Sequence, residues 1–112
     1  MRRSGAARAV RASAPVFAAL GDETRLGVLT RLAEDGPLSI TTLASGTAVT
    51  RQAVTKHLVV LEGAGLVARE RRGRESVFRL ERGGFSEAHR WLEAIADEWD
   101  QRIARLRAHV EG

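Results

Sequence analysis

Cysteine and tyrosine are absent from this chain of 112 residues, and only three phenylalanines and two tryptophans supply aromatic side chains. Without cysteine the chain can form neither disulfides nor thiolate metal sites, and it cannot sense oxidants through thiols. No apolar run approaches the roughly 18 residues of a membrane-spanning helix. Arg2 and Arg3 are followed by further arginines instead of an apolar stretch, so no secretory signal is expected. We therefore expect a cytoplasmic protein with no membrane partner.

Residues that an enzyme would need are also scarce. The three histidines are His57, His89 and His109, and no serine, carboxylate and histidine follow a pattern typical of a nucleophile triad. No glycine-rich loop joins a strand to a helix in a phosphate-binding pattern. The sequence therefore predicts a protein that is not an enzyme and has no cofactor.

Arginine, by contrast, is abundant. The chain has 18 basic and 14 acidic residues, a net charge of +4, and Lys56 is its one lysine. Residues 1–84 hold 14 basic and 8 acidic side chains, whereas residues 85–112 hold 4 and 6. Arginine forms paired hydrogen bonds with phosphate, so this distribution favours a polyanionic partner for the basic part of the chain. The alternative is an arginine-rich surface without a partner.

The length predicts one domain with a modest core, at residues 13–112, preceded by a flexible basic arm at residues 1–12. That arm either touches a DNA backbone or is only a disordered terminus. The domain is expected to open with a short helix that begins at Ser13, with Pro15 in its first turn. Asp22 is expected to cap a second helix that runs to about Ala33. Residues 38–40 are a candidate third strand beside a later hairpin.

Residues 41–65 predict a helix-turn-helix. Thr41 or Thr42 caps a brief helix through Ser45, a turn follows at residues 46–49, and Thr50 caps a second helix that stops at Gly65. At about 100° per residue, that second helix has an apolar stripe and an opposite, mainly polar face. The stripe holds Val54, Leu58 and Leu61, and the opposite face holds Gln52, Thr55, Lys56 and Val59. Such a face reads base edges in a major groove, or it is an ordinary solvated face.

A cationic hairpin is predicted directly after this helix. Residues 66–70 and 76–80 are strand-prone, and Gly73 permits the turn between them. The arginines of the hairpin are Arg69, Arg71, Arg72 and Arg74, and only Glu70 and Glu75 lie nearby to neutralise them. A hairpin of this kind is a wing whose tip can lie along a phosphate backbone. The alternative is an exposed hairpin whose arginines only maintain solubility.

Residues 82–84 (RGG) are expected to break the chain after the hairpin. The last predicted element is a long helix that begins at Phe85 or Ser86 and continues to about residue 111. Its apolar residues step by three and four along one stripe, and about 25 helical residues span about 37 Å. This is longer than one small domain needs, so the stripe is expected to pack against the same helix of a second copy. The alternative is packing on its own domain alone.

The order of these elements resembles the ArsR family of bacterial winged helix-turn-helix repressors, across about residues 14–110. The resemblance is carried by residues 19–25 (ALGDETR), residues 51–67 (RQAVTKHLVVLEGAGLV), and residues 71–75 (RRGRE) leading to residues 78–80 (FRL). The tail, with Trp91 and Trp99, is similar to the branch of the family that lacks metal ligands. The resemblance implies a homodimer paired through its first and last helices, which binds a palindromic operator in double-stranded DNA and represses transcription.

The resemblance and the helix geometry together give the expected site residues. The expected DNA contacts are Thr50, Arg51, Gln52, Thr55, Lys56, His57, Arg72 and Arg74. The expected dimer interface consists of Phe17, Leu92, Ile95, Trp99, Ile103 and Leu106. Helix geometry supports Gln52, Thr55 and Lys56 best. His57 lies on the flank of the apolar stripe, where it packs or touches a phosphate instead of reading a base.

The metal sites of the family are not expected here. The helix at residues 41–45 has no cysteine, and the tail begins a ligand pattern with Glu87 and His89 but continues it with Asp100 and Ile103, which leaves too few ligands. The sequence indicates no effector. The predicted fold is mostly α with a small β-hairpin, and the predicted function is a DNA-binding transcriptional regulator. The alternative is a winged-helix module that binds a protein partner and contacts DNA weakly.

Overall fold

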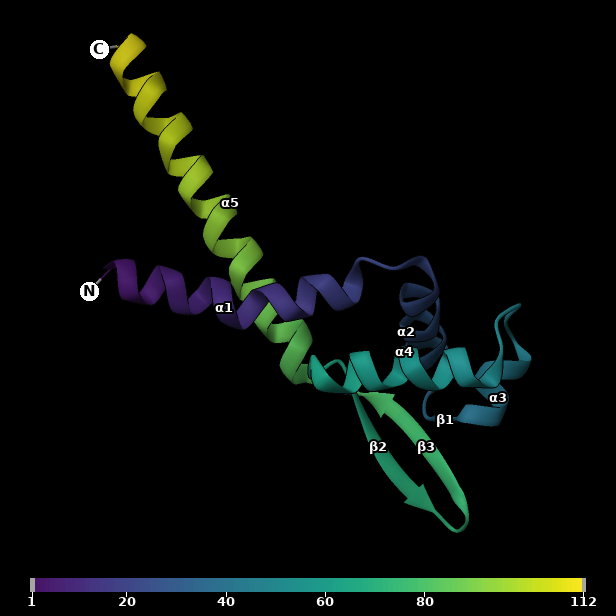
Figure 1. Ribbon diagram of the computed structural model, residues 1–112. Coiled ribbons are helices and arrows are strands. Elements are labelled where there is room, and N and C mark those ends of the chain that lie inside the picture. Colours follow the sequence, from purple (N-terminus) through teal and green to yellow (C-terminus); the bar gives the residue numbers. More distant parts are fainter. Residues whose placement is uncertain (1, 112) are drawn as a thin grey trace.

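The computed structural model describes residues 2–111 of the chain, with side chains from residue 6 onward. Within these residues the chain forms five helices and a small sheet, so the predicted fold class is confirmed (Figure 1). Residues 1 and 112, the ends of the predicted arm and domain, lie outside the described part. In order, the elements are α1 (Arg2–Leu20), α2 (Glu23–Asp35), β1 (Leu38–Ser39), α3 (Ile40–Ser45), α4 (Arg51–Gly63), β2 (Val67–Arg72), β3 (Glu75–Leu80) and α5 (Arg82–Glu111).

The core lies where α4 crosses the other helices and the base of the hairpin. Val54, Leu58 and Leu61 of α4 are fully buried, as their spacing predicts. They belong to one cluster with buried side chains of every other helix and of the hairpin, among them Phe78. Helix α4 is therefore held from several sides, and its opposite face must point outward.

The sheet has the strand order β1-β3-β2, and all of its pairs are antiparallel. The two residues of β1 pair with β3, Leu38 opposite Phe78, so the predicted third strand is confirmed. Gly73 has φ +63° at the first position of the two-residue turn between Arg72 and Glu75, where a hairpin of this kind requires glycine. The hairpin projects away from the helices as a wing (Figure 1).

Helix α1 differs from the prediction. It begins at Arg2 and not at Ser13, and Pro15 lies inside it and not in its first turn. The alanine-rich stretch before Ser13 favours helix, and Ser13 is buried, where its hydroxyl donates to Glu87 Oε1 at 3.2 Å. The predicted helix start is therefore wrong, whereas the division of the chain into an arm at residues 1–12 and a domain at residues 13–112 stays a prediction.

Helix α5 begins at Arg82, three residues earlier than predicted, because its glycines belong to the first turn and do not break the chain. The Gly84 N–H donates to the Gly65 carbonyl at 2.7 Å. A Cβ on Gly84 would lie 2.6 Å from the Ala64 carbonyl oxygen. This close approach of two backbones is possible only for glycine. It seats the start of α5 directly on the end of α4.

The cap of α3 also differs from the prediction. The Ser39 hydroxyl, and neither Thr41 nor Thr42, accepts the hydrogen bond from the free backbone N–H group of the first turn, that of Thr42. Asp22 and Thr50 cap α2 and α4 as predicted. Gly65 has φ +72°, the left-handed conformation expected after α4.

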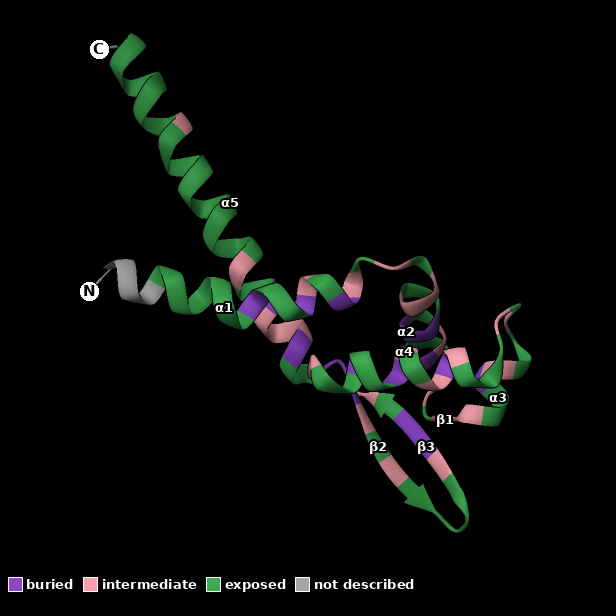
Figure 2. Cartoon of the chain, viewed as in Figure 1, coloured by how far each residue is buried: buried purple, intermediate pink, exposed green. Residues whose placement is uncertain are grey.

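The overall shape is elongated, with extents of 67 × 29 × 20 Å. The radius of gyration is 18.6 Å, against about 13 Å for a compact domain of this length. The cause is α5, which crosses α1 and then continues alone, almost wholly exposed (Figures 1 and 2). Between residues 2 and 111, no helix combines the length and the apolar character that crossing a membrane requires.

Candidate nucleic-acid interface

The outward face of α4 carries most of the predicted DNA contacts. Thr50 is exposed, and its hydroxyl accepts from the Ala53 N–H at 3.1 Å, which satisfies one of the free backbone donors of the first turn. Arg51, Gln52 and Lys56 are exposed and, with Thr55, line one shallow hollow of about 440 Å³. The structure therefore brings these side chains together on one face, opposite the buried stripe.

Thr55 is less available for hydrogen bonding than its position suggests. Its hydroxyl donates to the Arg51 carbonyl at 2.9 Å, so its one proton is used within the helix. What it offers outward is a methyl group and an acceptor lone pair. The strong donors of this face are therefore the side chains of Arg51, Gln52 and Lys56.

His57 lies on the other flank of α4 and faces the junction of α1 and α2. Its Nδ1 is 3.2 Å from Arg25 Nη1 and 3.9 Å from Asp22 Oδ2. Arginine can only donate, so Nδ1 accepts and Nε2 carries the proton of the neutral ring. The geometry thus separates His57 from the other predicted contacts, and its contact with DNA stays a prediction.

Arg25 ties three elements together, a role that the sequence does not reveal. Its Nε donates to the Ala19 carbonyl at 2.7 Å and its Nη2 to the Ala18 carbonyl at 3.2 Å, while Nη1 contacts His57. The backbone N–H of Arg25 donates to the carboxylate of Asp22, which lowers the pKa of that carboxyl group. The end of α1, the start of α2 and the middle of α4 are therefore joined by one side chain.

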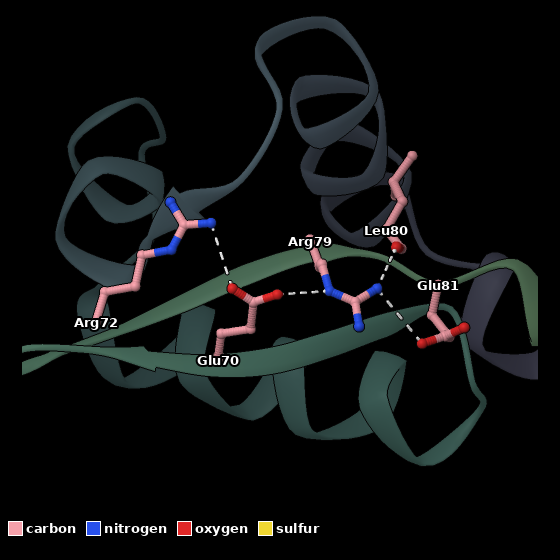
Figure 3. A network of polar contacts seen from close by, with 5 residues as sticks. All are labelled: Glu70, Arg72, Arg79, Leu80 and Glu81. Atoms are coloured by element: carbon pink, nitrogen blue, oxygen red, sulfur yellow. Dashed lines mark hydrogen bonds and ion pairs between the residues drawn. The ribbon is translucent and has the colours of Figure 1, made fainter.

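The arginines of the wing are not equally free (Figure 3). Arg79 Nε donates to Glu70 Oε1 at 2.8 Å, and Arg72 Nη2 to Glu70 Oε2 at 3.3 Å. Hydrogen bonds from Arg79 first, and then from Arg72, lower the pKa of the Glu70 carboxyl group. Arg79 Nη1 also lies 3.6 Å from Glu81 Oε2. Because Arg79 is held by two carboxylates, it can offer little to a phosphate.

The ion pair between Glu70 and Arg79 has one signal in the sequence, the spacing of the two residues across the hairpin. Glu70 lies opposite Val77 in the paired strands, and Arg79 is two residues beyond Val77, so Glu70 and Arg79 are diagonal neighbours. Diagonal neighbours of opposite charge on adjacent strands are within reach of long side chains. Arg69 is similarly engaged, with Nη2 at 3.5 Å from Glu62 Oε1 and its guanidinium 5.1 Å from the centre of the Phe78 ring.

Arg74, at the wing tip, and Arg51, at the start of α4, form no ion pair among the described side chains. Both line a cleft of about 150 Å³, whose polar walls also include Ser39, Thr41, Glu75 and Ser76. This cleft connects the outward face of α4 to the tip of the wing. Two guanidinium groups that form no ion pair within the described chain outnumber the one carboxylate of the cleft, that of Glu75, so the cleft is a suitable place for a phosphate.

The predicted dimer residues fall into two groups. Leu92, Ile95, Trp99 and Leu106 are exposed on α5, Trp99 by 61% and the others by about half, while Ile103 is intermediate. Phe17 instead packs edge-on against Trp91 of the same chain, with ring centres 5.4 Å apart. The stripe of α5 is thus free beyond the crossing with α1 (Figure 2).

Within residues 2–111, no three His, Asp or Glu side chains gather as a metal site would require.

The fold and the exposed face of α4 define a winged helix-turn-helix protein. A helix-turn-helix domain family matches residues 20–70. A solved ArsR-like transcriptional regulator from Rhodococcus sp. RHA1 is 40% identical, with a TM-score of 0.83, over 91% of this chain and 93% of that one. An uncharacterized HTH-type transcriptional regulator of Bacillus subtilis, YuzN, is 43% identical over 55% of this chain and 74% of its own length. The chain belongs to the ArsR family of helix-turn-helix transcriptional regulators.

A third relative carries a more specific name. The arsenical resistance operon repressor of Escherichia coli is 32% identical over 65 residues. The matched segment is 58% of this chain and 56% of that repressor, so the chain spans just over half the length of this relative. The family is one of transcriptional regulators and not of enzymes, in agreement with the class predicted from the sequence.

Proposed function

We propose that the protein is a homodimeric transcriptional repressor that binds a palindromic operator in double-stranded DNA. Each protomer inserts α4 into a major groove, where Gln52 and Lys56 meet base edges and Arg51 meets the backbone. The wing lies along the adjacent backbone through Arg72 and Arg74. Thr50, Thr55 and His57 complete the proposed contacts, Thr55 through its methyl group and acceptor lone pair, and His57 at most as a phosphate contact.

The observation that carries this proposal is the outward face of α4 together with the cleft beside it. The donors of Arg51, Gln52 and Lys56 converge on one exposed surface. Arg74 extends the same positive surface to the wing tip without a carboxylate partner among the described residues. A polar helix face next to uncompensated arginines suits the major groove and its flanking phosphates.

The exposed stripe of α5 supports the homodimer. Leu92, Ile95, Trp99 and Leu106 stand on one side of α5, which, past its crossing with α1, has no neighbour within the described chain. A monomer rarely exposes so long an apolar stripe, and a second copy of the helix would cover it. Two α4 helices related by a two-fold axis would then address two half-sites about one turn of the duplex apart.

The repressor role is supported by the name of the Escherichia coli relative, and it is a proposal for this chain. An α4 seated in a promoter would block access of the transcription machinery without any catalytic step. We place this function in the cytoplasm, together with the DNA that it requires.

The decisive experiment is a titration of a labelled duplex from the region upstream of the gene, beside a random duplex at the same salt concentration. A repressor of this kind binds the upstream duplex about 10³-fold more tightly or better, and binding saturates at two protomers per duplex. Equal affinities for the two duplexes would refute the proposal. Capture of a protein partner through α5, with only weak binding to any duplex, would establish the interaction module instead.

A further inference from the structure

The outward face of α4 contains one large apolar side chain among its polar ones. Val59 is 53% exposed. It belongs neither to the core nor to the partly buried residues packed against it. Val59 is seven positions after Gln52. Seven positions are close to two helical turns, so the two side chains lie within about 20° of each other around the helix. Val59 therefore lies on the same side of α4 as the proposed reading face, at the C-terminal end of that face.

The positions involved have a spacing that suits a groove. Gln52, Thr55, Lys56 and Val59 occupy positions i, i+3, i+4 and i+7 of α4. Residues that reach bases from a helix lying along the major groove have this same spacing. Val59 is thus the fourth member of a set whose other three members are already proposed as contacts.

Thr55 makes the centre of this face less polar than the sequence suggests. Its hydroxyl proton is donated to the Arg51 carbonyl at 2.9 Å, which leaves a methyl group beside the isopropyl group of Val59 one turn further on. The major groove has one apolar feature of matching size, the 5-methyl group of thymine. Cytosine carries only a hydrogen atom at this position, and the purines present their N7 and O6 or N6 atoms along the major-groove edge.

We infer that Val59 is a specificity residue that recognises the 5-methyl group of a thymine in each half-site of the operator. This inference rests on the proposed function, because it requires α4 to lie in the major groove. It adds a prediction about the sequence that is bound: each half-site holds a thymine at the position facing Val59. Gln52, which can bond adenine through two hydrogen bonds, would lie about 10 Å away along the helix axis.

The size of the effect follows from the burial of one methyl group per half-site. Removing one buried methyl group weakens binding about fourfold, and removing one from each half-site weakens it about 15-fold. Replacing thymine by deoxyuridine removes only this methyl group and keeps every hydrogen-bonding atom of the base pair. The replacement therefore isolates the contact without changing the pattern of donors and acceptors.

The experiment first obtains the operator by selecting duplexes from a random pool with the full-length protein. Each symmetric pair of thymines is then replaced by deoxyuridine, and affinities are measured for the unmodified protein, Val59→Ala and Val60→Ala. Val60 is 44% exposed and lies one residue further along α4, turned by about 100° from Val59. It is the matched control, because both variants make the same change on the same helix. Thermal unfolding shows whether both variants are folded.

The expected result is one thymine pair whose replacement weakens binding about 15-fold for the unmodified protein and for Val60→Ala, but leaves binding by Val59→Ala unchanged. If no thymine pair distinguishes Val59→Ala from the unmodified protein while both prefer the selected duplex, the inference is wrong and the proposed function stands. If selection yields no preferred duplex, the proposed function itself fails, and the inference fails with it.

Discussion

Arg74→Ala should flatten the dependence of DNA binding on salt, whereas Arg79→Ala should leave this dependence unchanged. Both substitutions remove one positive charge from the wing. Arg74 has no carboxylate partner among the described side chains and lines the cleft next to Arg51. Arg79 is held by Glu70 at 2.8 Å and by Glu81 at 3.6 Å (Figure 3). Of these two arginines, only Arg74 is therefore free to displace a counterion from a phosphate.

The magnitude follows from counterion release. Each phosphate contact contributes about −0.9 to the slope of log affinity against log salt concentration, and a dimer carries two copies of Arg74. The slope of the Arg74→Ala dimer should therefore be shallower by about 1.8. Between about 50 and about 200 mM salt, the affinity of the unmodified protein should fall about 12-fold further than that of the variant.

The assay is fluorescence anisotropy with the preferred duplex, at four or more salt concentrations, for the unmodified protein and the two variants. Thermal unfolding of both variants provides the control for folding. Equal flattening by Arg74→Ala and Arg79→Ala would mean that only the net charge of the wing matters. That result would refute the reasoning from local ion pairs, as would a slope for Arg74→Ala equal to that of the unmodified protein.

Three further predictions concern assembly and stability. Trp99→Glu should give a folded monomer by sedimentation, because this side chain is 61% exposed in one chain; a variant that sediments as a dimer would contradict the interface on α5. Gly84→Ala should lower the free energy of unfolding in urea by roughly 1–3 kcal/mol, because its Cβ would meet the Ala64 carbonyl oxygen at 2.6 Å. Gly83→Ala, whose nearest neighbour is 3.9 Å away, should cause no loss. The pKa of Asp22 is lower in the folded protein than its ordinary value of 3.8. The ionised carboxylate therefore stabilises the fold above pH 3.8, and this stabilisation is lost as the pH falls through the pKa of the folded state. Unfolding free energies measured at falling pH should therefore decline less steeply below pH 3.8 for Asp22→Asn than for the unmodified protein, and parallel curves would exclude this contribution.

The parts of the fold that the sequence predicts well are those determined by local spacing. The stripe of α4 and its cap at Thr50 need only nearby residues, and the same holds for the turns at Gly65 and Gly73. Their burial and backbone angles agree with the pattern because helical periodicity and left-handed glycine positions act within a few residues.

The differences arise where distant segments meet. Nothing near Gly84 in the sequence indicates that this residue must approach the carbonyl oxygen of Ala64. From the sequence alone, Gly84 is therefore interpreted as a break before the last helix. The approach of Gly84 to Ala64 and the contact of Ser13 with Glu87 are tertiary, and no local pattern predicts them. The early start of α1, by contrast, follows the local helix preference of the alanines before Ser13.

The candidate site follows the same rule. Helical spacing predicts that Gln52 and Lys56 share an outward face, and both side chains are exposed in the structure. The pairing of Arg79 with Glu70, which removes one arginine from the free charge of the wing, depends on strand register. The contact between His57 and Arg25 joins residues far apart in the chain, and no local pattern announces it.

At Gly84 the backbone at the start of α5 contacts the backbone at the end of α4 directly, with no side chain between them. In the proposed homodimer joined along α5, a change in the angle between the two tails would be passed through this joint to the separation of the two α4 helices. Since the half-sites of the proposed operator recur at about 34 Å, a slight change of this angle would move both helices out of register with the grooves. Release from DNA would then require no unfolding, only a change of angle far from the bases.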